Sequence, residues 1–444
     1  MLRTFPKGGV HPPENKLTAS KPIRRMPVPK VVYVPIAQHI GIPAEIAVAQ
    51  KDKVQAGQVI ARSGGVVSSN IHAPVAGTVT KLDKIVDTRG YKKQCIVIRT
   101  DLKDESNFQE VELPLKQEIT MEPDEILKRI SDFGIVGLGG ATFPSHVKLN
   151  IKEGKKLDCL IINGVECEPY LTADHRLMLE KTEEILVGIR ILMHALKVER
   201  AIIGIENNKK DAIELFKTIG RQEPGIQIAA LKVKYPQGGE KQLVRALLGR
   251  EVPKNGLPLD VGVVVHNVGT VFAIYQAVQH HKPLTERVVT VTGKKLENPS
   301  NFWVRIGTPI GDLLEAVGGV PEDTRKIISG GPMMGKALKN TDVPVTKGTS
   351  GILVISGEEA SRGPAGNCIR CGECVDVCPM GLEPHLLMNL SEKGLYEKAA
   401  REDIATCIEC GSCSYVCPAN RPLLDYIRFG KSITRQLESN KRQL

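Results

Sequence analysis

The spacing of hydrophobic residues changes several times along the chain, and each change marks a predicted domain. From Val31 to about Thr100, short β-branched runs lie between turn residues, which predicts a small all-β module over residues 31–100. Over residues 120–280 helical and strand patterns alternate, which favours an α/β domain. At 444 residues the chain has room for about three or more domains, so we expect a multidomain α/β protein.

Within the α/β segment, individual elements can be placed. Acidic residues before and within the first turn favour a helix over Pro123–Phe133, because carboxylates stabilise the positive end of a helix. Leu157–Ile162 and Ala201–Ile205 have the continuous apolar character of buried strands. Glu180–Leu196 has the period of a long helix.

Two further units follow the α/β segment. Residues 284–340 contain strand, strand, helix and strand patterns in an order that predicts a small β-grasp domain. Gly363–Gly366 is a hinge-like entry to a last domain over residues 360–437, which ends in a predicted helix over Leu423–Leu437. The four β-grasp elements are Val288–Thr292, Phe302–Val304, Ile310–Val317 and Lys326–Ile328.

The all-β module resembles the barrel-sandwich domains that carry biotin or lipoate. Lys53–Ile60 and Ile71–Val79 match the two half-motifs of those domains. Carriers present a modified lysine on the hairpin between the halves, but here that hairpin holds Ser68–Asn70. The module is therefore predicted to be structural, and the adjacent His72 to be packed rather than a ligand. Residues 1–30, rich in Pro and Lys, read as an extended arm that could lie on a partner.

Two cysteine runs near the C-terminus carry the clearest chemistry. Run one, residues 368–379, reads Cys-Ile-Arg-Cys-Gly-Glu-Cys-Val-Asp-Val-Cys-Pro, and run two, residues 407–418, reads Cys-Ile-Glu-Cys-Gly-Ser-Cys-Ser-Tyr-Val-Cys-Pro. Both have the spacing that binds a [4Fe–4S] cluster, and in two-cluster ferredoxins the fourth cysteine of each run serves the other cluster. We therefore predict cluster one on Cys368, Cys371, Cys374 and Cys417, and cluster two on Cys407, Cys410, Cys413 and Cys378.

The alternative metal is zinc, which prefers a tetrahedron of two Cys-x-x-Cys pairs. Two identical four-cysteine runs fit zinc poorly, so we favour iron–sulfur by about twenty to one. Clustered thiols and the lack of a secretory segment favour reducing surroundings. The remaining three of the 11 cysteines, Cys95, Cys159 and Cys167, are predicted to be small buried hydrophobes.

Charge and hydropathy narrow the range of partners. The net charge of +10 is compatible with an acidic protein or an anionic membrane surface. Aromatic residues make up 4% and no basic-aromatic motif is present, which disfavours nucleic acid. The most apolar stretch, Val261–Val278, is interrupted by polar residues, so any membrane association is predicted to be peripheral.

Glycines over Gly134–Pro144 suggest a nucleotide loop, but not the usual dinucleotide fingerprint. That fingerprint follows a strand and enters a helix, whereas here a predicted helix precedes the glycines and Thr142 takes the place of the third glycine. The glycine density still indicates amides presented to an anion such as phosphate. A tight structural turn is an equally good interpretation of the glycines alone.

Four motifs in one order resemble the NADH-binding flavoprotein subunit of respiratory complex I. Residues 137–148 match its flavin-phosphate loop, Gly-x-Gly-Gly-Ala-x-Phe-Pro-x-x-x-Lys. Residues 163–169, 238–240 and 266–270 resemble its next three motifs. This resemblance covers about residues 120–340 and implies a Rossmann-like FMN/NADH domain followed by a β-grasp domain of the SLBB type.

The whole layout resembles RnfC, the peripheral NAD(H)- and FMN-binding member of Rnf complexes, more closely still. The shared features are the Gly-Gly-Val-His-Pro opening at residues 8–12, the barrel-sandwich module, Gly-Gly-Pro-Met-Met-Gly at residues 330–335 and the twin cysteine runs. Rnf complexes are membrane-bound ferredoxin:NAD⁺ oxidoreductases that transport Na⁺ or H⁺. The resemblance implies a peripheral subunit at the cytoplasmic face, held by other Rnf membrane and ferredoxin-like subunits.

The resemblance also implies roles for single residues. The implied reaction requires no acid–base or nucleophilic side chain, so no catalytic residue is expected. A capping carboxylate is the competing interpretation for Glu166 and Glu168, and an ordinary core aromatic for Phe143. Gly137, Gly139, Gly140 and Lys148 would hold the FMN phosphate, Asn163, Glu166, Gly239, Glu240, Asn267 and Thr270 would line the flavin, and Phe143 and Glu168 would contact NAD(H).

Four positions depart from the complex I pattern: Leu138, Val165, Lys241 and His266. Val165 and Lys241 each replace a carboxylate, which makes the expected site less negative. A less negative site favours the anionic reduced flavin, so we expect a raised flavin potential, to be checked by titrating the isolated subunit.

The implied function is electron transfer between two [4Fe–4S] clusters and NAD(H) through FMN. One alternative is a soluble flavoprotein reductase of similar modules, such as a cobalamin reductase. A second alternative is a scaffold that docks a ferredoxin domain without an enzymatic role.

Overall fold

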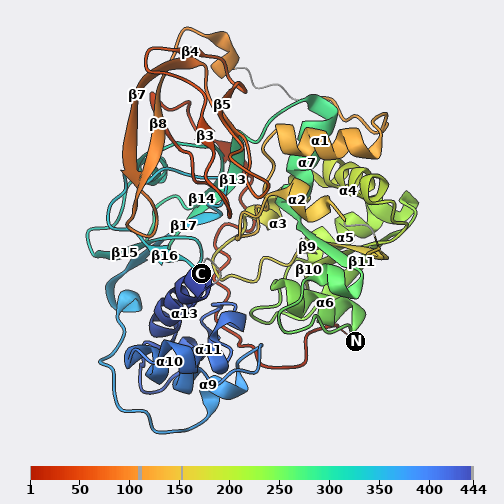
Figure 1. Ribbon diagram of the computed structural model, residues 1–444. Coiled ribbons are helices and arrows are strands. Elements are labelled where there is room, and N and C mark those ends of the chain that lie inside the picture. Colours follow the sequence, from red (N-terminus) through yellow and green to blue (C-terminus); the bar gives the residue numbers. More distant parts are fainter. Residues whose placement is uncertain (1, 109–112, 152–153, 442–444) are drawn as a thin grey trace.

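The computed structural model describes residues 2–108, 113–151 and 154–441. Figure 1 shows four domains around a central junction, with the red and orange strands above, the green α/β domain to one side and the blue helices below. The N-terminal segment crosses the junction and reaches three of these domains. At the junction, Tyr235 of the α/β domain donates to the carbonyl oxygen of Cys410 in run two (2.8 Å).

The first domain is made of two small sheets with a shared core. In β2, Val32 and Val34 are fully buried between the sheets, as expected for alternate side chains of a strand. The sheets have the orders β2-β8-β7-β4 and β3-β5-β6, and β7 and β8 form a long hairpin. The strands are β2 (Val31–Pro35), β3 (Glu45–Ile46), β4 (Lys53–Val54), β5 (Val59–Arg62), β6 (Ile71–His72), β7 (Gly77–Val86) and β8 (Lys92–Thr100), followed by the short helix η1 (Glu105–Asn107).

The hairpin that would carry a lysine in a carrier domain is docked onto the rest of the chain. The Asn70 side chain donates to the carbonyl oxygen of Asp132 (3.1 Å), and the Asn70 backbone carbonyl accepts from Lys347 (2.8 Å). His72 stacks on Phe133 with ring centres 6.2 Å apart, and burial lowers its pKa to about 3. These contacts agree with the prediction of a structural module and a packed histidine.

The second domain has a four-stranded parallel sheet with helices packed against it. Strand order is β11-β10-β9-β12, so the chain moves outward from β9 and then returns to its other side. The predicted helix over residues 180–196 is broken at Lys181 into two. The elements are α1 (Pro123–Asp132), α2 (Ser145–Leu149), β9 (Cys159–Gly164), α3 (Ala173–Glu180), α4 (Thr182–Leu196), β10 (Ala201–Glu206), α5 (Lys210–Ile219), η2 (Gly220–Gln222), β11 (Ile226–Leu231), α6 (Glu240–Leu248), η3 (Pro258–Val261), β12 (Val263–Asn267) and α7 (Val268–His280).

The third domain is a six-stranded mixed sheet with one short helix. Its order is β1-β14-β13-β17-β15-β16, and the strands at positions one and four lie outside the predicted range of residues 284–340. β17 is inserted in parallel beside β13, a pairing that no local pattern reveals. The elements are β1 (Ile23–Arg25), β13 (Glu286–Thr292), β14 (Ser300–Arg305), α8 (Ile310–Glu315), β15 (Thr324–Ser329), β16 (Lys336–Ala337), β17 (Gly351–Ser356) and the following η4 (Gly357–Ala360).

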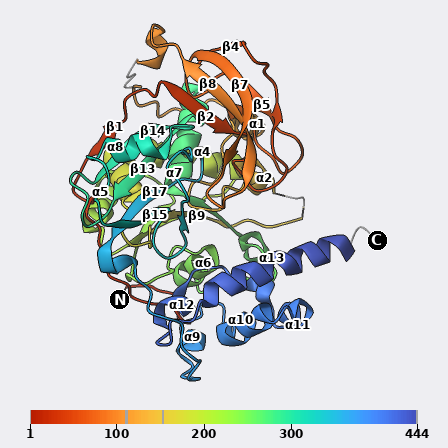
Figure 2. The ribbon, with the colours of Figure 1, turned by 90° about the vertical axis from the view of Figure 1, so that its left-hand side faces the viewer.

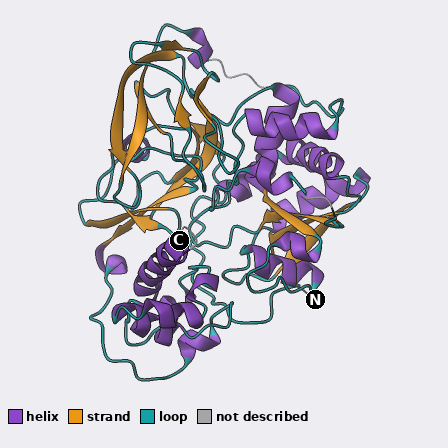
Figure 3. Cartoon of the chain, viewed as in Figure 1, coloured by secondary structure: helices purple, strands orange, loops and turns teal. Residues whose placement is uncertain are grey.

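The last domain is drawn as helices and loops in Figure 3. Short helices follow the cysteine loops, and the long α13 packs on α10 and extends away from the body of the molecule in Figure 2. Its elements are α9 (Glu373–Asp376), α10 (Pro384–Glu392), α11 (Tyr396–Arg401), η5 (Ile404–Thr406), α12 (Ser412–Val416) and α13 (Leu423–Lys441).

The N-terminal arm lies on the chain's own domains. Arg3 pairs with Leu231 at the edge of the parallel sheet, and Val10 pairs with Tyr235. Residues 23–25 then form β1 beside β14. The sequence predicts an arm that could lie on a partner, but much of its backbone between residues 3 and 25 pairs within this chain.

Candidate functional site

Two asparagines stand side by side where the parallel sheet changes direction. Asn163 lies near the end of β9 and Asn267 ends β12, and they are register partners on adjacent strands. After β9 the chain continues to β10 on one side, whereas β12 lies on the other side of β9. The gap between the ends of β9 and β12 is therefore the topological switch point of the sheet. Ligands of open parallel sheets bind in the crevice at such a point.

The glycine loop of residues 134–144 lies over this crevice and is fixed by hydrogen bonds within the loop and to Thr270. Gly137 donates to the Phe143 carbonyl (2.9 Å), and the Leu138 amide donates to Thr270 Oγ1 (2.9 Å). A Cβ on Gly139 would approach Asn267 to 3.0 Å, so the loop touches the strand end directly. Thr270 therefore anchors the loop backbone.

The same loop leaves an open cradle at Gly140. Its φ of +137° favours glycine, and a Cβ there would meet no atom within 4 Å. In the part of the chain that the structure describes, no hydrogen bond joins the amides of Gly139 and Gly140 to an acceptor. Free amides in such a loop suit an anionic group such as a flavin phosphate.

Lys148 and Glu240, which belong to different motifs, meet at the rim of the crevice. Their ammonium and carboxylate groups form an ion pair, with 25% and 46% of the side chains exposed. His266, near the end of β12, is 3% exposed, and its Nε2 has no partner among the described residues. Burial, and secondarily Lys148, hold the His266 pKa well below its ordinary value, so the ring is neutral. A buried polar atom without a protein partner, within electrostatic reach of Lys148, also fits a bound ligand.

The asparagines organise the crevice walls. Asn267 Oδ1 accepts from the amides of Gly269 (2.9 Å) and Thr270 (3.3 Å), which caps α7. The Asn267 amide donates to Asp174 Oδ2 (2.6 Å), a residue that no sequence motif indicated. Asn163 donates to the carbonyl of Gly238 (2.8 Å) and so fixes the turn before Gly239 and α6.

Glu166 has the contacts of a helix cap. Its carboxylate accepts from the amides of Asp174 (2.8 Å) and His175 (3.2 Å) at the start of α3. Burial, and next the Glu166 charge, raise the pKa of Asp174 well above its ordinary value. The capping interpretation therefore describes these contacts, and Glu166 shapes the crevice from its base.

Glu168 points away from the glycine loop, toward residues 330–335. It accepts from the amides of Met333 (3.1 Å) and Met334 (2.8 Å), and the Tyr235 hydroxyl lies 3.5 Å from its Oε1. Burial raises the Glu168 pKa to about 7. Gly331 has no room for a side chain because Glu168 packs against it.

Phe143 and Lys241 complete the positions predicted from sequence. Phe143 is half-buried, and its carbonyl closes the glycine loop onto Gly137. Lys241 donates to the carbonyls of Pro253 (2.7 Å) and Lys254 (2.9 Å), so its charge is directed away from the crevice. This weakens the electrostatic reason for a raised flavin potential, which stays a prediction.

Sequence reasoning missed four buried cations around the crevice. Lys347 donates to the Gly134 carbonyl (2.6 Å), and Arg287 donates to the Lys347 carbonyl (2.5 Å) and to the Leu138 carbonyl (3.4 Å). An isolated Lys or Arg carries no motif, so no signal in the sequence marks these two residues. From the arm and the start of α5, Lys16 and Lys209 hold the carbonyls of Val165, Glu166, Glu168 and Leu171.

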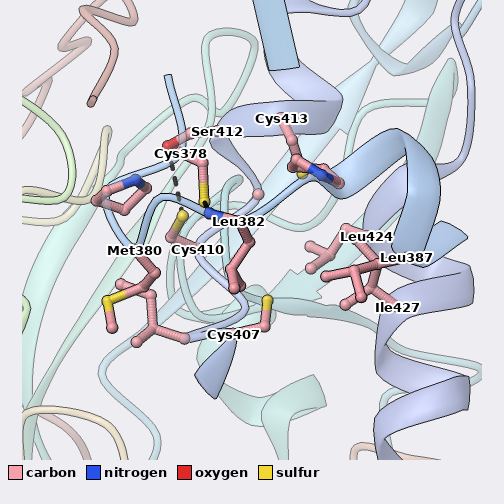
Figure 4. A pocket seen from close by; sticks show the side chains of 14 residues that line it. Cys378, Met380, Leu382, Leu387, Cys407, Cys410, Ser412, Cys413, Leu424 and Ile427 are labelled. Carbon is pink, nitrogen blue, oxygen red and sulfur yellow. Dashed lines mark hydrogen bonds between the residues drawn. The ribbon is translucent and has the colours of Figure 1, made fainter. Parts of the chain in front are cut away.

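The thiols predicted for cluster two line one cavity, shown in Figure 4. Cys378 comes from run one, whereas Cys407, Cys410 and Cys413 come from run two. Burial, and next its three neighbouring thiols, raise the pKa of Cys413. Apolar side chains such as Leu387 and Ile427 line the rest of the cavity, so the four sulfurs lie in largely apolar surroundings.

The thiols predicted for cluster one are grouped at the surface. Burial raises the pKa of Cys374, and the thiols of Cys371, Cys417 and Cys368 raise it further. Cys368 and Cys371 are exposed, and so is every residue of the loop over residues 361–371. The thiols of each predicted set therefore influence one another's pKa, and the two crossed ligand sets stay a prediction.

Four protein families match the chain in the order of its domains. The RnfC barrel sandwich hybrid domain matches residues 4–103 and the Nuo51 FMN-binding domain matches residues 130–276. The SLBB domain matches residues 288–337 and the 4Fe-4S dicluster domain matches residues 362–421. These matches confirm the predicted fold class.

Three relatives resemble the chain over nearly its whole length, and each is the C subunit of an oxidoreductase complex. That of the proton-translocating ferredoxin:NAD(+) oxidoreductase complex of Clostridium ljungdahlii is 47% identical over 98% of this chain and 95% of the relative. Its counterpart from the Na(+)-translocating complex of Acetobacterium woodii is 44% identical over 96% of each. The one from the ion-translocating oxidoreductase complex of Rhodobacter capsulatus is 43% identical over 98% of this chain and 84% of the relative. Among the described residues, no helix combines the length and apolar character needed to cross a bilayer.

Proposed function

Because this chain belongs to the RnfC family of ion-translocating ferredoxin:NAD(+) oxidoreductase complexes, the Rnf complexes, we propose that it passes electrons between two [4Fe–4S] clusters and NAD(H) through FMN. The complex couples this reaction to ion transport. One observation carries the proposal: a crevice suited to a flavin phosphate and a cavity lined by four thiols lie on one chain.

The chain's own residues bind and orient the groups. The amides of Gly139 and Gly140, the turn at Gly137 and the Lys148 charge would hold the FMN phosphate. When bound, FMN supplies two-electron exchange with NAD(H) and one-electron exchange with a cluster. The flavin would lie along a wall made by Asn163, Glu166, Gly239, Glu240, Asn267 and Thr270.

The dinucleotide would enter beside Phe143. Glu168, the residue proposed to bind its ribose hydroxyls, already accepts from the amides of Met333 and Met334. A carboxylate has about four acceptor positions, so it can receive a ribose hydroxyl while it keeps those bonds. No side chain of the crevice is required as an acid, base or nucleophile.

The sulfur ligands are proposed as two crossed sets. Cys368, Cys371, Cys374 and Cys417 would hold cluster one, and Cys407, Cys410, Cys413 and Cys378 cluster two. Other Rnf subunits, including ferredoxin-like and membrane subunits, would exchange electrons with these clusters. They would also hold the chain at the cytoplasmic face of the membrane, as a peripheral subunit.

The test is the absorbance of purified chain reconstituted with iron, sulfide and FMN under anaerobic conditions. NADH should bleach the flavin band near its maximum and then the broad cluster absorbance. The Gly140→Val variant, which fills the open cradle, is expected to lose FMN while it keeps both clusters. Failure of NADH to bleach bound flavin would favour the scaffold alternative. The soluble reductase alternative gains no support from the three relatives, which are all subunits of complexes.

A further inference from the structure

Tyr235 joins the α/β domain to run two. The residue follows β11, is 1% exposed, and donates its hydroxyl to the carbonyl oxygen of Cys410 (2.8 Å). Its ring packs with Val10 and Cys410 in one buried cluster, to which Cys167 and Met333 also belong. Any shift of one domain against the other would break the hydrogen bond from the buried Tyr235 hydroxyl to the Cys410 carbonyl. Tyr235 therefore fixes the separation of the two domains.

The N-terminal arm closes the same junction from another side. Val10 and Tyr235 exchange two backbone hydrogen bonds (2.8 and 2.9 Å), and Gly9 donates to the Val377 carbonyl (2.9 Å). A Cβ on Gly8 would lie 2.6 Å from the backbone of Cys378, the residue that run one lends to cluster two. The arm thus ties the cluster-two loops to Tyr235 through its main chain.

The Gly-Gly-Pro-Met-Met-Gly loop forms the third side. Glu168 holds the amides of Met333 and Met334, and Arg428 from α13 donates to the Met334 carbonyl (3.1 Å). A Cβ on Gly411, between two cluster-two cysteines, would lie 2.8 Å from the Met333 carbonyl. Residues of the dinucleotide crevice and of run two therefore contact one short loop.

We propose that cluster two is the inner cluster and exchanges electrons with the flavin crevice. Cluster one is the outer cluster and exchanges electrons with a partner protein. Tyr235 is the positioning residue of the inner cluster. This proposal rests on the proposed function. Among the described residues, no hydrogen bond joins the cluster-one cysteines to the α/β domain, and the loop over residues 361–371 is exposed throughout. Single electrons pass, no bond forms or breaks, and Tyr235 remains a hydrogen-bond donor.

The position of each cluster can be tested in the full wild-type chain with both clusters reduced. A dysprosium(III) chelate in the solvent shortens the electron spin relaxation of a nearby paramagnet. One cluster signal should relax several-fold faster with the chelate and the other should change little. Equal relaxation of the two signals overturns the inner and outer assignment.

Tyr235→Phe tests the positioning role in the same preparation. Mediated redox titration followed by electron paramagnetic resonance should show a lower midpoint potential for the chelate-insensitive cluster, because a donor near it is lost. The other cluster should keep its potential. Single-turnover reduction of the clusters by NADH should slow several-fold, with the dissociation constant for FMN unchanged.

Tyr396→Phe is the matched control, since Tyr396 lies in the same domain and packs only against Phe429 among the aromatic rings described. It should leave both potentials unchanged. The positioning role of Tyr235 is contradicted if Tyr235→Phe shifts the midpoint potential of the chelate-sensitive cluster, of both clusters or of neither. Mediated titration does not require NADH, so this result stands apart from failure of the dehydrogenase function.

Discussion

Run one and run two share a spacing and nearly a sequence, yet their surroundings are opposite. Cys368 and Cys371 of run one are exposed, whereas Cys410 and Cys413 of run two are 8% and 9% exposed. The residue before the second cysteine is Arg370 in run one and Glu409 in run two, and their φ values are +57° and +58°. The motif therefore specifies the cluster loop and not its environment.

The environment comes from residues far away in the sequence. Tyr235, Gly8 and Met333 cover the cluster-two loops, and none of them belongs to an iron–sulfur motif. Hydrogen-bond donors near the sulfurs and solvent exposure tune cluster potentials, so two loops of equal shape can hold clusters with different reduction potentials.

The largest difference is expected from removing one sulfur ligand in each run. Cys410→Ser and Cys371→Ser should each lower the iron content from about eight to about four per chain. Cys410→Ser should in addition lower the thermal midpoint of the domain, because it places a hydroxyl in buried, largely apolar surroundings with Ser412 as its polar neighbour, and desolvation of a hydroxyl costs about 1–3 kcal/mol. Iron analysis and thermal loss of cluster absorbance measure both effects. Equal midpoints in the two variants would show that run two is not protected by its burial.

Slow oxidation should separate the clusters in the unchanged protein. The exposed loop of run one lets oxidant and chelator reach cluster one, while Cys410 and Cys413 of run two are buried in a cavity lined mostly by apolar side chains. Iron release into a chelator under limiting air should occur in two phases of about equal amplitude, with the first several-fold faster. A single phase would contradict the difference in access.

Gly372 and Gly411 occupy the same motif position, and both have a left-handed backbone. A Cβ on Gly372 meets nothing within 4 Å, whereas one on Gly411 meets the Met333 carbonyl at 2.8 Å. Gly372→Ala should cost only the left-handed strain of about 1–2 kcal/mol. Gly411→Ala should cost that strain and about 1–3 kcal/mol of overlap. Chemical unfolding of the two variants, followed by cluster absorbance, gives the comparison, and equal losses would show that the Met333 contact adds nothing.

The smallest effect is expected from the charges within the loops. Glu409 pairs with Lys431 (3.0 Å) and Arg428 (3.3 Å), so its charge is partly balanced, and Arg370 is exposed to solvent. Glu409→Gln should raise the potential of cluster two, because a negative charge near it is lost. Arg370→Gln should lower that of cluster one. Each shift should be below about 59 mV, the value for a tenfold change in a one-electron equilibrium. Shifts of the same sign would contradict the electrostatic origin.

Features that a local pattern encodes could be predicted from the sequence. Domain order and the glycine loop follow from periodicity, spacing and resemblance, because each motif of these families has a fixed backbone shape, whereas the crossed cysteine sets stay a prediction. The glycine loop could be assigned to an anion because open amides need no partner from elsewhere. The residue-by-residue roles at the crevice stay predictions.

Contacts between distant segments could not be predicted. Nothing near Lys347 or Arg287 marks them as supports of the glycine loop, since a buried cation differs from a surface one only by its surroundings. The motif around Glu168 assigns it to the dinucleotide, but its two amide donors come from residues 333 and 334. The arm's contacts with its own chain were equally hidden, because an extended segment shows no pattern for the surface that it covers.

The arm also imposes an order of events during synthesis. Domains emerge from the ribosome and fold from the N-terminus onward, but Gly9 finds its acceptor only when Val377 has been made. Residues 8–10 are thus translated long before they can take their final place. They can settle only when the iron–sulfur domain is complete, so a nascent chain without that domain exposes this segment to proteases.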